Sequence, residues 1–216
     1  MESEEIEHLN HYLETVIEDI DALDEKREAV LRLNRKLNRM SGKGIALLVR
    51  GKIPTELLKV ADELMNEIAG EMQDLEALTG WSPLVSGVEE YCEFRILHGI
   101  LQDGTIPLAG VLKAPSWIWV VSLGDVIGEL RRFVLGKLLE GEIEEAEKKL
   151  EVMDTLYTHI AGLEFPKAVT GSLRNKVDIA RVLLERTQSD LLHAKKLITE
   201  TNVSSQTDCK NPSNIS

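Results

Sequence analysis

Aromatic residues are scarce in this sequence and make up only 4% of its 216 residues. RNA-recognition sheets and oligonucleotide-binding barrels stack bases on aromatic faces, so this composition argues against both. The two cysteines, Cys92 and Cys209, provide neither a disulfide framework nor the ligand spacing of a zinc site. This cysteine usage predicts a reducing, intracellular environment.

Long apolar runs are also missing. The longest, residues 117–123, is far shorter than the ~20 residues that a helix needs to cross a bilayer. The N-terminus is acidic, whereas a signal peptide begins with basic residues. We therefore predict a cytoplasmic protein without a membrane partner. The sequence also has no glycine-rich phosphate loop and no alternation of strands with helices, which argues against an α/β nucleotide-binding fold.

Charge is distributed unevenly along the chain. The formal net charge of −12 would by itself argue against a nucleic-acid partner. Residues 1–25 include ten acids and no Lys or Arg, whereas residues 26–52 include nine Lys or Arg and a single acid, Glu28. Such an asymmetry can create a focused positive surface on an acidic protein. The alternative is a solvated basic helix face with no ligand.

Helical periodicity dominates the sequence and predicts an all-α fold. Apolar residues spaced three and four apart predict a long first helix from about Ile6 to Met40. Further helices are predicted from Pro54 to about 78, over 84–101, from Ser116 to about 139, over 142–160, and from 171 to about 198. The segment 105–115 contains two prolines and is predicted to be a loop.

The last residues of the sequence differ in composition from the rest. Residues 199–216 are polar and rich in Ser, Asn and Thr. Such a segment buries too little apolar surface to become ordered by itself. We therefore predict one helical domain over residues 1–198 and a disordered polar tail over 199–216.

Two pairs of acids lie in otherwise apolar predicted helices. Glu90 and Glu93 are three residues apart, and Asp125 and Glu129 are four apart, so each pair shares one helix face. Residues 115–124, before Asp125, are uncharged, which is typical of a buried helix. A buried carboxylate must be paired, protonated or bound to a cation, because leaving it isolated costs several kcal/mol.

The four acids could together surround Mg²⁺ or Mn²⁺, which prefer oxygen ligands. A cation held in this way could activate water for attack on a phosphodiester. The alternative is a structural network in which Glu93 pairs with Arg95 or Arg131, and Asp125 with Arg132. Spacing alone does not separate these two interpretations.

Basic residues at three- and four-residue steps predict a ridge on the first helix. Phosphate contacts from such a ridge give affinity without sequence choice and depend strongly on salt. The start of the last predicted helix is basic as well, although its basic residues could pair with acids of the same helix. The residues predicted to bind RNA are Arg32, Arg35, Lys36, Arg39, Lys43, Arg50, Arg174 and Lys176.

Three stretches of the sequence match motifs of one family. Residues 87–93 read Gly-Val-Glu-Glu-Tyr-Cys-Glu, residues 122–130 read Ser-Leu-Gly-Asp-Val-Ile-Gly-Glu-Leu, and residues 165–181 begin Phe-Pro-Lys-Ala-Val-Thr-Gly-Ser-Leu. Together they resemble the translin family, in particular archaeal members related to translin-associated factor X. In the factor X branch the first two motifs run Gly-Leu-Gln-Glu-Tyr-Val-Glu and Gly-Val-Ala-Asp-Leu-Thr-Gly-Glu-Leu. The resemblance covers residues from about 5 to 198.

The resemblance implies an antiparallel bundle of about six to seven helices that assembles into a homo-octameric shell around nucleic acid. In the factor X branch, carboxylates matching Glu90, Glu93 and Asp125 form a magnesium-dependent ribonuclease site, with Glu129 nearby. We therefore predict a catalytic site of these four acids, with Mg²⁺ as cofactor and Mn²⁺ as a substitute. The predicted partners are short single-stranded or duplex RNA, single-stranded DNA as a further ligand, and other copies of the chain.

Two alternative functions remain open from the sequence. Translin proper lacks the matching Glu pair and Asp and mainly binds nucleic acid, so a non-catalytic binding shell is the first. The second is an all-α nucleoside triphosphate pyrophosphatase, because Glu89-Glu90-x-x-Glu93 fits the first half of that group's motif. Its second half is usually Glu-x-x-Asp, whereas this chain has Asp-x-x-x-Glu.

Overall fold

The computed structural model describes the backbone of residues 3–208 and, within that range, all side chains except those of residues 3–4, 73–74, 76–79, 168 and 201–208. The described chain is helical and contains no strand, which confirms the all-α fold class. Its α-helices are α1 (Ser3–Leu48), α2 (Thr55–Thr79), α3 (Val85–His98), α4 (Ser116–Glu140), α5 (Ile143–Ala161), α6 (Lys167–Thr170) and α7 (Leu173–Asp208).

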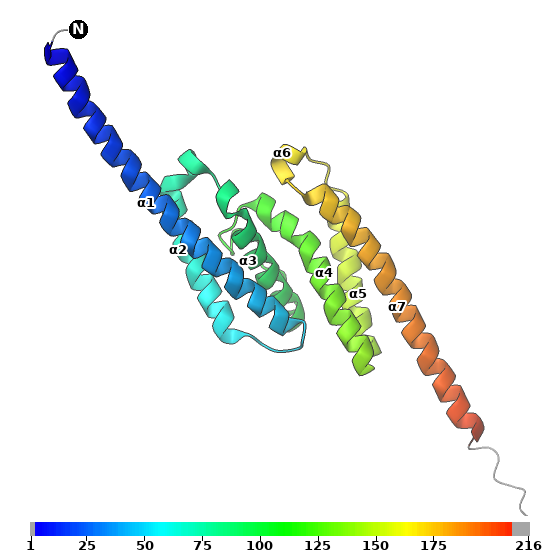
Figure 1. Cartoon of the computed structure of the whole chain (residues 1–216). Helices are drawn as coiled ribbons and strands as arrows, with labels where there is room; N and C mark the ends of the chain where they lie inside the picture. The colour runs from blue at the N-terminus through cyan, green and yellow to red at the C-terminus, as the bar shows by residue number, and fades with distance from the viewer. Residues whose placement is uncertain (1–2, 209–216) are drawn as a thin grey trace, which may run out of the picture.

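The long helices lie side by side in two groups (Figure 1). Helix α1 packs against α2 and α3, and α4 packs against α5 and α7. The two groups meet where α3 packs on α4. Side chains such as Leu37 of α1, Phe94 of α3 and Ile127 of α4 are fully buried in one continuous apolar core. Burying each side chain of this size contributes about 1.5–3 kcal/mol, so the core holds α3 and α4 in fixed register.

Glycine ends two of these helical segments as the sequence predicts. Helix α3 continues into a π-helical turn, Gly99–Asp103, which ends at Gly104 with a φ of 65°. Helix α4 ends at Gly141 with a φ of 78°, where the Gly141 N–H donates to the carbonyls of Leu138 and Lys137. Both backbone conformations are left-handed and favour glycine. Helix α4 begins at Ser116, as predicted, and the residue before it, Pro115, makes no side-chain capping bond.

The C-terminal part of the chain differs from the prediction at two points. The short helix α6 was not predicted, because four residues are too few for a periodic pattern. Helix α7 reaches Asp208, ten residues beyond the end predicted for the last helix. This segment has no Gly or Pro to break a helix, and Lys196 pairs with Glu200 one turn later. Residues 209–216 of the predicted tail lie outside the described residues.

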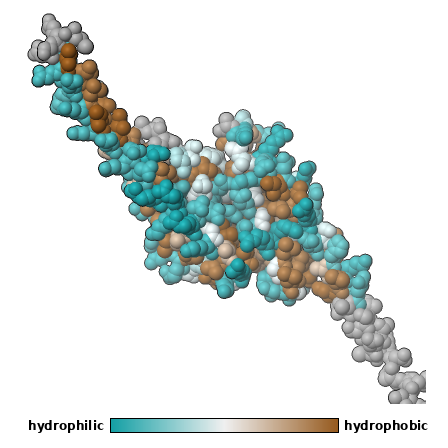
Figure 2. All heavy atoms as spheres, in the orientation of Figure 1, coloured by the Kyte–Doolittle hydropathy of each residue, from teal (hydrophilic) through white to brown (hydrophobic). Residues whose placement is uncertain are grey.

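The first turns of α1 project from the body of the molecule, and the end of α7 projects in the opposite direction (Figure 1). An apolar stripe, visible as brown spheres in Figure 2, follows one side of the projecting part of α1. Its members are between 44% and 58% exposed and recur three and four residues apart. They are Ile6, Leu9, Leu13, Ile17 and Ile20. Within residues 3–208, no helix is long and apolar enough to span a membrane.

Candidate functional site

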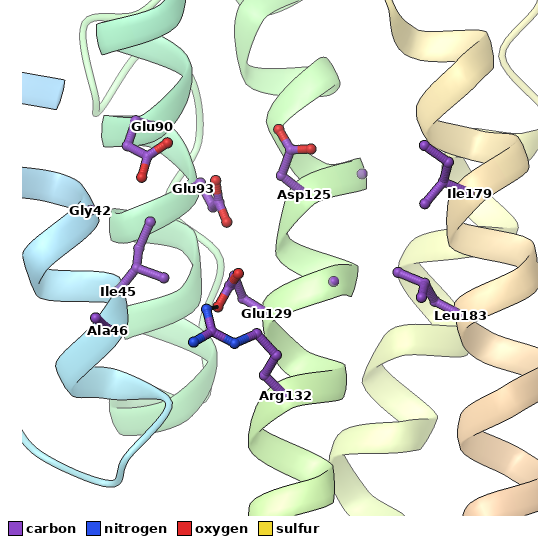
Figure 3. Close-up of a pocket in the computed structure, with 12 residues that line it drawn as sticks. Gly42, Ile45, Ala46, Glu90, Glu93, Asp125, Glu129, Arg132, Ile179 and Leu183 are labelled. Carbon is purple, nitrogen blue, oxygen red and sulfur yellow. Dashed lines mark hydrogen bonds and ion pairs between the residues drawn. The ribbon is translucent and has the colours of Figure 1, made fainter.

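The four predicted acids line one cavity of about 520 Å³ (Figure 3). Glu90 and Glu93 come from α3, and Asp125 and Glu129 come from the facing side of α4. Helix α1 closes one side of the cavity with Gly42, Ile45 and Ala46, and α7 contributes Ile179 and Leu183. The structure therefore brings together acids that are up to 39 residues apart in the sequence.

Small residues allow the helices around the cavity to approach closely. A Cβ atom at Gly42 of α1 would lie 3.0 Å from Glu90 Oε1, so the Glu90 side chain uses the space that a larger residue would fill. The hydroxyl of Ser122, one turn before Asp125, donates to the carbonyl oxygens of Ile118 at 2.9 Å and of Glu89 at 3.2 Å. This second bond joins α4 to α3 beside the acids. Ser122 could not be predicted from the sequence, because a lone serine in an apolar helix belongs to no pattern.

Burial raises the pKa of the acids on α3. Glu93 is only 7% exposed, and burial, followed by the nearby charges of Asp125, Glu90 and Glu129, raises the pKa of its carboxyl to about 9. The pKa of Glu90 is also raised, by burial first and then by Asp125 and Glu129. Neither carboxylate forms a hydrogen bond or an ion pair with another residue whose side chain the structure describes. At neutral pH Glu93 therefore holds a proton unless a cation replaces it.

The acids on α4 have cationic neighbours. Glu129 Oε2 accepts a hydrogen bond from Arg132 Nη1 at 2.7 Å. Asp125 Oδ2 contacts the ammonium of Lys176 from α7, which also contacts Glu89. Burial, followed by the charge of Glu129, raises the pKa of Asp125 to about 6.

The ion pairs that the alternative structural network predicts for Glu93 do not form. Arg95 pairs with Asp62 of α2 at 3.3 Å rather than with Glu93. Arg131 pairs with Asp190 of α7 at 2.9 Å and donates to Thr187 at 2.7 Å. Among the described side chains, the acids on α3 that line the cavity thus form no ion pair with an arginine, although the charge of Arg132 lowers the pKa of Glu93 by less than the acids raise it. This charge imbalance is the main reason to consider a cation at the site.

The chemistry of the cavity fits Mg²⁺, although the side chains are not gathered around one point. Carboxylate oxygens from two helices are the donors that Mg²⁺ and Mn²⁺ prefer. In the described part of the chain, however, no three His, Cys, Asp or Glu side chains are close enough together to hold a metal ion. A cation would therefore require these side chains to rotate toward one another. Glu90, Glu93 and Asp125 are the residues that could hold it.

The predicted basic ridge runs beside the cavity. Gly42 and Ala46 line the cavity and follow Arg39 and Lys43 by three residues, so the two sets are neighbours on the surface of α1. Arg174 is exposed near the start of α7, whereas Lys176 is largely buried against the acids. The exposed members of the ridge on α1 are Arg32, Arg35, Lys36, Arg39 and Lys43, and Arg50 is exposed in the turn that follows the helix.

Solved structures share this architecture. The chain matches AfC3PO with 30% identity and a TM-score of 0.77, covering 86% of this chain and 98% of that one. It matches AfC3PO in complex with duplex RNA with 29% identity and a TM-score of 0.78, covering 86% and 97%. Apo-NeC3PO is 21% identical with a TM-score of 0.76, over 84% of this chain and 96% of that one, which shows a shared fold.

A sequence relative also matches most of the chain. An uncharacterized protein from Methanocaldococcus jannaschii is 30% identical over 176 residues, which are 78% of this chain and 76% of that protein. No protein-family model matches the sequence. The fold is thus the translin-type helical bundle of the C3PO structures. The chain belongs to the translin family.

The raised pKa of Glu93 predicts a specific dependence of stability on pH. The folded protein keeps the Glu93 proton up to about pH 9, whereas the unfolded chain releases it near the usual pKa of 4.5. Folding therefore takes up a proton between these values, and the stability that Glu93 contributes falls as pH rises through this window. In EDTA, we expect Glu93→Gln to be more stable than wild type at pH 8 by on the order of 3 kcal/mol, and by much less at pH 5.

Thermal unfolding of both proteins at several pH values measures this difference. Glu63→Gln, which changes an exposed glutamate of α2, is the matched control and should show no such trend. If Glu93→Gln were less stable than wild type at pH 8, Glu93 would be ionised and stabilised in the folded protein, against this expectation.

Proposed function

We propose that this protein is a magnesium-dependent ribonuclease of the factor X type, in which Glu90, Glu93 and Asp125 hold the metal. The observation that carries the proposal is the cavity lined by four acids from two helices, of which Glu90 and Glu93 form no ion pair with an arginine among the described side chains. Bound Mg²⁺ would supply an activated water and would stabilise negative charge on the phosphate. The chain's own acids supply the oxygen ligands, and Glu129, held by Arg132, lies at the edge of the same group.

The basic ridge would bind the RNA backbone. A strand whose phosphates follow Arg35, Arg39 and Lys43 passes Gly42 and Ala46, which line the cavity. The ridge thus provides affinity without sequence choice, and the acids provide the chemistry. The solved complex of AfC3PO with duplex RNA supports RNA as the ligand. Single-stranded DNA offers the same phosphates to the ridge and is a further proposed ligand.

The chemistry is best tested by a cleavage assay on short single-stranded RNA in Mg²⁺ or Mn²⁺. We expect wild type to cut the RNA and EDTA to stop the reaction. Glu93→Gln should cut at least about 100-fold more slowly, because it removes a charged group from the reacting site. RNA binding should survive, since the loss of an acid does not weaken attraction for phosphate. Glu63→Gln is again the control for substitution of a glutamate.

Two results of this assay would contradict the proposal. If Glu93→Gln cut RNA as fast as wild type, the acids would not form the active site. If wild type bound RNA in saturating Mn²⁺ without cutting it, the protein would be a non-catalytic binding shell. Release of pyrophosphate from nucleoside triphosphates would instead favour the pyrophosphatase, for which the translin-type fold provides no independent support.

The role of the ridge is tested by the salt dependence of RNA binding. Each lysine that neutralises a phosphate of single-stranded RNA contributes about 0.7 to the slope of log affinity against log salt. We therefore expect Lys43→Gln to weaken binding and to lower that slope by about this amount. Lys59→Gln, which removes an exposed lysine of α2, should leave both unchanged. Equal effects of the two substitutions would mean that binding depends on overall charge rather than on the ridge.

We further propose that the chain assembles into a homo-octameric shell through the apolar stripe on α1. Exposed contiguous apolar surface is a feature of association sites. The stripe projects away from the core of its own chain, so only another molecule can cover it (Figure 2). In a closed shell each chain would present the same surface to its neighbours.

Light scattering coupled to size-exclusion chromatography measures the assembly. Eight chains of 24.2 kDa should give a mass of about 190 kDa for wild type. Leu13→Glu combined with Ile17→Glu should lower the mass, because it places charge in the stripe. His11→Glu combined with Thr15→Glu adds the same number of acids to the other side of α1 and should leave the mass unchanged. A monomeric wild type, or an octamer in both variants, would rule out this interface.

A further inference from the structure

Lys176 is held in place by packing as well as by charge. It lies in the first turn of α7, close to the buried Leu173, and its side chain is only 16% exposed. Its stem crosses Gly124 of α4, where an added Cβ would lie 2.7 Å from Lys176 Cβ. The path of this side chain between α4 and α7 therefore depends on the absence of a side chain at residue 124.

The ammonium of Lys176 connects three helices at the edge of the acidic cavity. It leaves α7 and contacts Glu89 of α3 and Asp125 Oδ2 of α4. Asp125 Oδ1 has no partner among the described side chains. The other residues predicted to bind RNA form no ion pair with the acids of the cavity in the described part of the chain. Lys176 is thus placed differently from the residues of the ridge.

We propose that Lys176 is a positioning residue for the metal site. By binding one oxygen of Asp125, and by being held in turn by Glu89, it fixes the Asp125 carboxylate and leaves the other oxygen for the cation. Carboxylates that bind metals are commonly oriented by hydrogen bonds from a second layer of residues. The inference rests on the proposed magnesium site and adds to it a residue that would not itself touch the metal.

Two other roles for Lys176 make different predictions. A direct contact with RNA phosphate would require an exposed ammonium, whereas this one is largely buried and already engaged by two carboxylates. In the second role, the positive charge of Lys176 would only repel the cation and so weaken metal binding. Removal of Lys176 would then tighten metal binding. A positioning role predicts the opposite sign, because Asp125 would lose its fixed orientation.

The test is the affinity of the full-length protein for Mn²⁺, measured by calorimetry without RNA. We expect Lys176→Met to weaken Mn²⁺ binding by about 10- to 100-fold, the range seen when second-layer partners of metal ligands are removed. RNA binding in EDTA should change little. Lys195→Met is the matched control, because Lys195 also lies on α7 and pairs with an acid, Glu147, at a distance from the cavity. This control should bind Mn²⁺ as wild type does.

A second variant changes the position of Lys176 without changing any charge. Gly124→Ala would force the Lys176 Cβ, and with it the first turn of α7, away from α4, so we expect weaker Mn²⁺ binding here too. Gly136→Ala, at a site on α4 with open space around it, should not affect binding. This pair of variants keeps the proposal testable if Lys176→Met does not fold.

The outcomes separate this inference from the proposed function. Unchanged or tighter Mn²⁺ binding by Lys176→Met, or unchanged binding by Gly124→Ala, would overturn the positioning role while leaving the metal site intact. Loss of RNA affinity in EDTA as large as that of Lys43→Gln would make Lys176 a phosphate contact instead. No Mn²⁺ binding by wild type would overturn the proposed metal site itself.

Discussion

The burial of carboxylates between α3 and α4 is the constraint on which the site depends. Glu93 lies in the core-facing part of α3, and its carboxyl is protonated up to about pH 9. A protein gains no stability from such a group in its charged form, since burial of an isolated carboxylate costs several kcal/mol. Glutamine or leucine would suit the same position better if packing alone mattered. An acid at this position therefore fits the metal site that we propose better than it fits a purely structural role.

Close packing of the helices buries the carboxylates, which costs free energy, and it also brings the acids to one cavity. Gly42 lets α1 approach Glu90, and Gly124 lets α7 approach Asp125. Ser122 then fixes the axial position of α4 relative to α3, because its hydroxyl donates a hydrogen bond to the carbonyl of Glu89. Larger residues at these points would separate the helices, and the four acids would then face solvent. Small residues on α1 and α4 thus define the cavity together with the acids.

Periodicity and spacing were sufficient to predict the main helices and to group the acids correctly into two pairs. A period of 3.6 residues is strong in long amphipathic segments, and so the limits of α2, α4 and α5 lie close to those expected. Helix α6 is too short to show a period, and the end of α7 has a polar composition that is compatible with a helix or a coil. The contact of Lys176 with Asp125 could not be predicted, since it links residues 51 positions apart and depends on the docking of α7 on α4. Spacing along one helix carries no information about which neighbouring helix supplies the counter-charge.

The distribution of charge would allow a chain with a net charge of −12 to bind an anionic polymer, as we propose. Coulomb interactions at physiological salt are screened over about 8 Å, so a phosphate responds to the side chains near it rather than to the sum over the molecule. On α1 the acids of residues 1–25 lie mostly on the projecting part, and the exposed bases begin where the helix joins the body. A strand bound to those bases would reach the edge of the acidic cavity, where its own charge would be repelled unless a cation were present. The proposed cation would reduce the repulsion between the acids and would also make the cavity accessible to phosphate. Substrate binding at this site would then depend on metal binding.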